Sequence, residues 1–282
     1  MKLGMNMLLW TGHVTEEHVP IFGELREAGF DGVEIAVGEG DADHYKKLGA
    51  ACDQVGLERS IVTILDVDTN PISPDKKIRE AAVERLRWVI EMTNAFGGTR
   101  LTGPFHSAYK TFEGRGATDD ERRWCADVMR EVADEAYDAG MVLALEPLNR
   151  FECYLMNTSA DARAVIDLCD HPNVGMLYDT HHMHIEEKDA AAAVKLGGSA
   201  IRHVHASECD RGRPGSGQVA WDATFRALHE IGYDDWLVIE AFSTMDKDFA
   251  AAIHIWRDFD PPEEIWRDGG AFVRQAWEST AS

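Results

Sequence analysis

Two glutamates, Glu146 and Glu152, end the segment MVLALEPLNRFE directly after its apolar run. A carboxylate at the edge of an apolar core is costly unless it is paired, hydrogen-bonded or bound to a metal ion. The pair therefore predicts a compensating partner elsewhere in the chain.

Three other polar residues stand at comparable places in other apolar runs. Asp179 ends VGMLYD, His205 lies in IRHVHAS, and Glu240 follows WLVI. Together with Glu146 they offer three carboxylates and one imidazole, a donor set that suits Mn²⁺, Co²⁺ or Mg²⁺ better than a thiolate-binding ion. A single acid after a strand is more often a helix cap or a surface residue, so the metal hypothesis depends on all four occurring together.

The elements that must position these residues follow a repeating pattern. Short apolar runs alternate with longer segments of helical periodicity, and there are eight such pairs. Helices are expected at 75–97 and 119–139, the second with a capping box from Thr118 to Glu121. The strand-like runs are residues 3–10, 32–37, 60–65, 99–104, 141–147, 174–179, 201–207 and 236–242.

Eight strand and helix pairs predict an α/β fold, a single (β/α)₈ TIM barrel over residues 1–282, with a C-terminal helical appendage from about residue 259. A doubly wound sheet is less consistent, because no glycine-rich phosphate-binding signature follows the first strand. Active-site residues of such barrels lie at the carboxyl ends of the strands. Glu146, Asp179, His205 and Glu240 should therefore meet at one mouth.

The amino-acid composition indicates which kinds of molecule the protein can bind. The chain has 50 Asp and Glu against 28 Lys and Arg, a formal charge of −22 that disfavours nucleic acid and anionic membrane surfaces and favours a small-molecule partner. Its five cysteines include no CxxC pair, which indicates reduced thiols. The short apolar run near the N-terminus is too short for a signal peptide or a membrane span, so a cytoplasmic protein is expected.

Other polar residues near the strand ends are candidates for ligand binding. The cluster HHMH contains His182 and His184, which would share one side if the strand continued. Arg211 lies in a glycine-rich turn, where it could bind a hydroxyl or an anion or could be solvated, and phosphate binds at this place in many barrels. Trp10 and His13, after the first strand, could form a wall of the pocket.

The strings ALEPLNRFE, YDTHHMHIEE, HVHASECDRG and VIEAFS, in this order, resemble the ketose 3-epimerase family, the D-tagatose and D-allulose (psicose) 3-epimerases of the xylose isomerase-like barrels. The similarity covers nearly the whole chain. It implies a single divalent metal ion, usually Mn²⁺ or Co²⁺, bound by Glu146, Asp179, His205 and Glu240. It also implies substrate binding by Glu152, His182 and Arg211, and a homodimer or homotetramer. His184 stands where the family pattern has asparagine.

The expected reaction is C3 epimerisation of a free ketose of the tagatose/sorbose, fructose/allulose or ribulose/xylulose type. A metal ion would stabilise the enediolate formed when the C3 proton leaves. Glu146 and Glu240, from strands three places apart, would act as acid and base on opposite faces. Three alternatives stay open: an aldose–ketose or hydroxypyruvate-type isomerase, a nuclease of the endonuclease IV type, which the −22 charge disfavours, and a sugar-binding barrel without activity.

Overall fold

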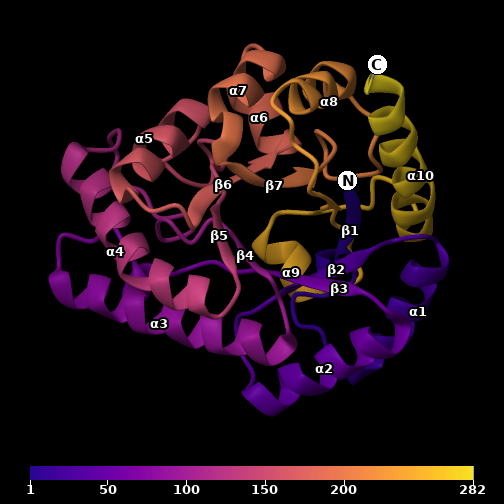
Figure 1. The fold of residues 1–282 in the computed structure, drawn as a ribbon, viewed down its shortest axis with the longest axis horizontal. Helices are drawn as coiled ribbons and strands as arrows, with labels where there is room; N and C mark the ends of the chain where they lie inside the picture. Colours follow the sequence, from indigo (N-terminus) through magenta and orange to yellow (C-terminus); the bar gives the residue numbers. More distant parts are fainter. Residues whose placement is uncertain (282) are drawn as a thin grey trace.

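Eight parallel strands close into a barrel in the computed structural model of this protein, which describes residues 1–281 (Figure 1). The first strand pairs in parallel with both the second and the eighth, which closes the ring as predicted. The strands are β1 (Lys2–Asn6), β2 (Gly32–Ala36), β3 (Glu58–Val62), β4 (Arg100–Gly103), β5 (Val142–Leu145), β6 (Val174–Asp179), β7 (Ile201–Ala206) and β8 (Trp236–Ile239).

The strands are largely buried, as expected for a parallel sheet whose outer face is covered by helices. All eight predicted strands are present, although most are shorter than predicted. The first prediction, 3–10, extends too far, because the Asn6 side chain accepts a hydrogen bond from the Leu8 amide at 2.9 Å and begins a 3₁₀ turn there. The strand therefore stops where its last side chain caps the following turn.

The helices surround the barrel, and the two predicted in detail are confirmed. Thr118 and Glu121 form the predicted capping box at the start of the fourth helix. The helices are α1 (Val19–Glu27), α2 (Ala42–Val55), α3 (Lys76–Phe96), α4 (Asp119–Asp138), α5 (Ser159–Cys169), α6 (Thr180–Glu186), α7 (Ala190–Gly197), α8 (Trp221–Glu230), α9 (Lys247–Ala252) and α10 (Pro262–Thr280).

The last two helices have different roles. In Figure 1, α9 lies inside the ring of outer helices, over the centre of the barrel. The final helix, α10, was expected near 269–279 as part of an appendage; it begins at Pro262 and packs against β1, β8 and α8. Trp266, Val273 and Trp277 are buried in that contact. It thus covers the seam where the barrel closes, as the outer helix that follows β8.

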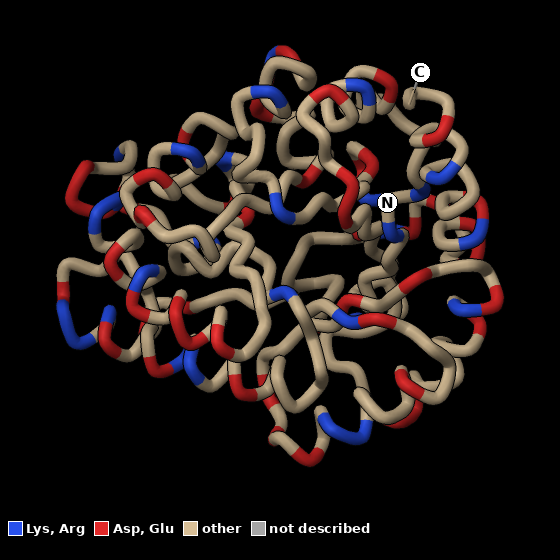
Figure 2. The backbone as a smooth tube through the Cα atoms, viewed as in Figure 1, with Lys and Arg blue, Asp and Glu red and all other residues tan. Residues whose placement is uncertain are grey.

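The acidic residues are spread around the outer helices and loops (Figure 2). All five cysteines are free thiols, as predicted. Among residues 1–281, no helix combines the length and the apolar character that crossing a membrane requires.

Candidate active site

The four residues predicted as metal ligands converge at one end of the barrel. His205 Nδ1 lies 3.7 Å from Glu146 Oε1, 3.6 Å from Asp179 Oδ2 and 3.4 Å from Glu240 Oε2. One potential ligand atom from each of the four residues lies within 4.8 Å of the others, and all four residues are buried. Four adjacent strands, β5 to β8, therefore bring three carboxylates and an imidazole to one point.

Two of these ligand atoms have no hydrogen-bond partner among residues 1–281. Glu146 Oε1 and His205 Nδ1 are both buried and make no hydrogen bond within the described chain. The other ring nitrogen, His205 Nε2, lies 2.7 Å from Glu34 Oε1. A proton on Nε2, donated to this carboxylate, leaves Nδ1 with a free lone pair toward the three acids. Buried polar atoms in this arrangement fit a divalent cation that accepts oxygen and nitrogen ligands.

The cluster contains more buried carboxylates than positive groups, so a bound cation would stabilise it. Burial, together with the carboxylates of Glu240 and Asp179, raises the pKa of Glu146 to about 8, although His205 lowers it. Burial alone lowers the pKa of His205, but Glu240 and Glu34 raise it well above its usual value. So much negative charge in a buried site favours any cation that can enter.

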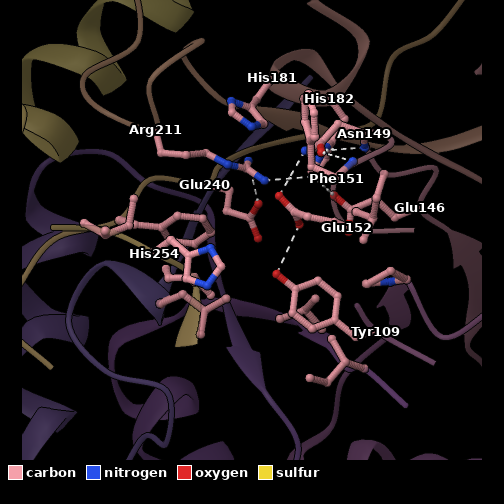
Figure 3. Close-up of a pocket in the computed structure, with 18 of the residues that line it drawn as sticks. Tyr109, Glu146, Asn149, Phe151, Glu152, His181, His182, Arg211, Glu240 and His254 are labelled. Carbon is pink, nitrogen blue, oxygen red and sulfur yellow. Dashed lines mark hydrogen bonds and ion pairs between the residues drawn. The ribbon is translucent and has the colours of Figure 1, made fainter. Parts of the chain in front are cut away.

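Arg211 supplies one positive charge to this cluster. Its Nη1 donates to Asp179 Oδ2 at 2.8 Å. The same Nη1 donates to Glu240 Oε2 at 2.9 Å (Figure 3). Burial alone raises the pKa of Asp179, but Arg211 and neighbouring histidines lower it well below its usual range. The Arg211 side chain is itself buried. It is therefore part of the site and not a solvated turn residue, the alternative that its sequence context left open.

The loop that carries Arg211 is fixed by a buried carboxylate. Glu208 accepts hydrogen bonds from the backbone amides of Cys209, Gly215, Gln218 and Val219 at 2.9 to 3.1 Å. Arg211 itself has a positive φ of 66°, a conformation that is uncommon for residues other than glycine. The loop is thus held in one shape by contacts to Glu208.

Glu152 and His182 lie in the same pocket and are linked by Asn149. Glu152 accepts from the Asn149 side chain at 2.9 Å and from the Tyr109 hydroxyl at 3.1 Å (Figure 3). The backbone amide of Asn149 donates to His182 Nδ1 at 3.1 Å, and Arg211 Nη2 lies 2.8 Å from His182 Nε2. Glu152, His182 and Arg211, which the family resemblance assigns to substrate binding, therefore form one connected network with Asn149 and Tyr109.

A cavity of about 380 Å³ opens above this network. Glu146, Glu152, His182, Arg211 and Glu240 line its polar side. The opposite walls are apolar and come from the strand ends of β1 and β3 and from α9 with the segment after it. The apolar lining residues there are Leu8, Val62, Ile64, Phe249, Ile253 and Ile255. A pocket of this size and composition is typical of small-molecule sites.

Three other residues singled out in the sequence lie elsewhere. Trp10 and His13 are not among the residues that line this cavity, and their role in substrate binding stays a prediction. The strand does not continue through HHMH: residues 180–186 form α6, in which His182 is buried and His184 is exposed. The helix begins there because the Asp179 side chain accepts from the His181 and His182 amides and caps it.

Comparison with known proteins agrees with this geometry. The sequence profile of the family described as "Xylose isomerase-like TIM barrel" matches residues 22–276. A ketose 3-epimerase of Arthrobacter globiformis is 34% identical over 278 residues, which cover 97% of this chain and 96% of the relative. The chain belongs to the ketose 3-epimerase family of xylose isomerase-like barrels. Its homologues are named as carbohydrate epimerases, and the chain is an enzyme of this class.

Solved structures of such epimerases superpose closely on this family member. An L-ribulose 3-epimerase has a TM-score of 0.92 at 29% identity, with 99% of this chain and 96% of that chain covered. A D-psicose 3-epimerase of Clostridium cellulolyticum H10, solved with D-tagatose, has a TM-score of 0.91 at 27% identity, with 98% and 99% covered. The similarity extends over the whole barrel.

Sequence reasoning missed one residue that contacts His205, the histidine of the candidate metal cluster in this family member. Glu34, in the middle of β2, is fully buried. It accepts a hydrogen bond from the side-chain amide of Asn6 at 2.9 Å and is also hydrogen-bonded to His205 Nε2. His203 Nε2 lies 3.1 Å from its other oxygen. The sequence feature that could have identified Glu34 is that it is the single acid within the apolar run GVEIAV, in a strand that is buried on both faces.

Replacing Glu34 with glutamine should weaken metal binding without unfolding the barrel. The carboxylate that orients His205 becomes a neutral amide, and the loss of such a partner lowers metal affinity about 10- to 100-fold. Calorimetric titration of the metal-free protein with Mn²⁺ measures the change.

The control is Ser60→Ala, because the Ser60 hydroxyl donates to Glu34 Oε2 at 3.0 Å but is not hydrogen-bonded to His205. This variant should keep the wild-type affinity to within about threefold, since only a peripheral bond to the same carboxylate is lost. Equal affinities for wild type and Glu34→Gln would show that Glu34 does not orient the histidine.

Proposed function

We propose that this protein is a metal-dependent ketose 3-epimerase that interconverts C3 epimers of free ketoses. The observation that carries the proposal is the convergence of Glu146, Asp179, His205 and Glu240 beside a sugar-sized cavity that Glu146 and Glu240 line. Two buried ligand atoms of this cluster have no hydrogen-bond partner among residues 1–281. Ketose 3-epimerases similar along the whole chain support it.

The four convergent side chains would hold one divalent ion, with Mn²⁺ favoured and Co²⁺ or Mg²⁺ compatible with the donor set. When bound, such an ion supplies Lewis acidity that lowers the energy of negative charge on neighbouring substrate oxygens. The protein would fix the position of this ion, because two of its ligands are held in place. Glu34 orients His205, and contacts with Arg211 and with the first turn of α6 orient Asp179.

Glu146 and Glu240 are the proposed acid and base. They follow β5 and β8, so a sugar between them would present opposite faces of C3 to the two carboxylates. One carboxylate takes the proton from C3, and the electron pair delocalises into the C2 carbonyl. The other carboxylate delivers a proton to the opposite face, which inverts C3. The pKa of about 8 that burial gives Glu146 applies to the metal-free site, and a bound divalent ion would lower it and favour the carboxylate form that accepts a proton.

Glu152, His182 and Arg211 are proposed to bind the hydroxyl and carbonyl oxygens near the reacting carbon. An unphosphorylated substrate is favoured, because the Arg211 guanidinium already binds Asp179 and Glu240 and three glutamates line the same cavity. The homodimer or homotetramer that the sequence resemblance implies stays a prediction.

Product analysis separates this proposal from an aldose–ketose isomerase of the same family of barrels. Purified protein is incubated with Mn²⁺ and D-fructose, D-tagatose or D-ribulose, and the products are resolved by chromatography. Conversion of at least one of these sugars to its C3-epimeric ketose is expected, with no activity after the metal is removed by a chelator. An aldose as the main product would favour the isomerase and contradict the proposal.

A further inference from the structure

A second cavity adjoins the candidate active site at the same end of the barrel. It encloses about 590 Å³, and four side chains line both cavities: Leu8, Val62, Ile64 and Phe249. The first cavity, at about 380 Å³, is near the lower end of the range of about 300–1,000 Å³ for small-molecule sites. One small sugar would therefore use the first cavity, and the second is additional space beside it.

The position of the second cavity relates it to the far end of a bound substrate. The proposed acid and base follow β5 and β8, whereas the second cavity is lined by the segments after β2 and β3. Its remaining walls include Gly38, Thr63 and Leu65. A ketose with C3 between Glu146 and Glu240 can extend its remote carbons over Leu8 and Ile64 into this space.

Two groups of opposite charge give the second cavity its polar character. Arg85 donates through Nη2 to the backbone oxygen of Gly38 and packs on the Trp88 ring, 4.1 Å from its centroid. Within residues 1–281, its Nε and Nη1 make no hydrogen bond. Asp66, at the exposed rim of the cavity, uses Oδ1 to cap the turn at Val67–Thr69, which leaves Oδ2 as a free acceptor in the described chain. The cavity thus offers unused donors and an unused acceptor.

This combination fits a neutral polyhydroxyl group. Hydroxyls can accept from the guanidinium and donate to the carboxylate, and the C–H face of a sugar ring can pack on Phe249. A phosphate would bring its charge close to Asp66, whereas an alkyl chain would pair neither the free donors of Arg85 nor the free oxygen of Asp66. The two opposite charges therefore match a neutral glycosyl unit better than an anion or a lipid.

We propose that the second cavity is a subsite for a neutral glycosyl unit attached to the ketose at the end remote from C3. This inference rests on the proposed ketose 3-epimerase function and extends its substrate class to glycosylated ketoses. The first cavity binds the ketose unit, and Arg85 and Asp66 bind hydroxyls of the attached sugar.

The experiment compares two probes, D-fructose and 6-O-α-D-glucopyranosyl-D-fructose, with three variants. Gly38 is an exposed residue that lines the second cavity, and a Cβ added there meets nothing within 4 Å, so Gly38→Trp places an indole at the rim of the cavity without a backbone clash. Arg85→Met removes the donors and keeps the aliphatic stem. Gly23→Trp, on α1 and outside both cavities, also adds an indole where a Cβ meets nothing within 4 Å, and is the matched control.

Wild type should epimerise both sugars. Gly38→Trp and Arg85→Met should each lower kcat/KM for the glucosylated ketose by about tenfold or more and change that for fructose by less than about twofold. Gly23→Trp should change neither. Equal effects of Gly38→Trp on both sugars, or turnover of fructose with no turnover of the glucosylated ketose, would overturn the subsite.

Calorimetric binding separates failure of the subsite from failure of the proposed reaction. If wild type epimerises neither sugar but binds the glucosylated ketose about tenfold more tightly than Gly38→Trp does, the subsite stands and the proposed reaction is wrong. If wild type and Gly38→Trp bind it equally, or neither binds it, the subsite is wrong.

Discussion

Glu240→Gln should lower kcat for epimerisation by about 10²- to 10⁴-fold, because one of the two groups that exchange a proton with C3 is lost. The amide keeps the size of the side chain and one oxygen, so the fold and the contact with Asn6 should persist. The rate is measured at saturating Mn²⁺ with the metal content of each preparation determined. Glu146→Gln should have an effect of the same order.

Isotope exchange in these variants distinguishes two bases from one. With Glu240 replaced, Glu146 can still remove and return a proton on its own face, so one C3 epimer should exchange hydrogen with D₂O without inversion. Glu27→Gln, an exposed substitution on α1, is the control and should keep wild-type activity. Epimerisation by Glu240→Gln at the wild-type rate would rule out its role as acid or base.

Arg211→Met should destabilise the metal-free protein strongly. The guanidinium is buried between Asp179 and Glu240, and its loss leaves two buried carboxylates without this partner. Breaking a buried ion pair costs about 3–5 kcal/mol, and in a chain of this length the Tm should fall by roughly 5–15 °C. Calorimetry at pH 8 after treatment with a chelator measures the shift.

Added Mn²⁺ should recover part of this loss, because a divalent ion bound by the same carboxylates replaces the missing positive charge. The increase in Tm with Mn²⁺ should be larger for Arg211→Met than for wild type. Arg226→Met, an exposed position on α8, is the control and should leave the metal-free Tm nearly unchanged. Equal Tm values for the two variants would mean that Arg211 does not balance the buried acids.

The ring of polar strand ends could be predicted because the barrel imposes a simple rule. Once eight strand and helix pairs are recognised, the carboxyl ends of the strands must lie at one end of the barrel. Glu146 and Glu240 directly follow their strands, and Asp179 and His205 are the last and next-to-last residues of theirs, so all four were expected to meet there. The burial of Arg211 could not be predicted by this rule, because it depends on a loop that backbone contacts to Glu208 hold in one shape.

The rest of the site depends on packing that periodicity does not describe. The family resemblance assigned His182 to substrate binding, and alternation would have grouped it with His184 if the strand continued. Capping by Asp179 instead begins a helix there, which buries His182 and leaves His184 exposed. Glu34 lies inside a strand and not at its end, so the strand-end rule did not include it. Tyr109 and Phe249 reach the cavity from long loops and a short helix, whose paths are determined by tertiary contacts.

Deuterium incorporation at C3 is the decisive test of epimerisation by this protein. The Mn²⁺-loaded protein is incubated in D₂O with D-fructose, D-tagatose or D-ribulose, and each carbon is followed by NMR. The account predicts deuterium at C3 together with appearance of the C3-epimeric ketose. Deuterium at C1 or C2 with an aldose product, or no exchange at any carbon despite bound metal, would contradict it.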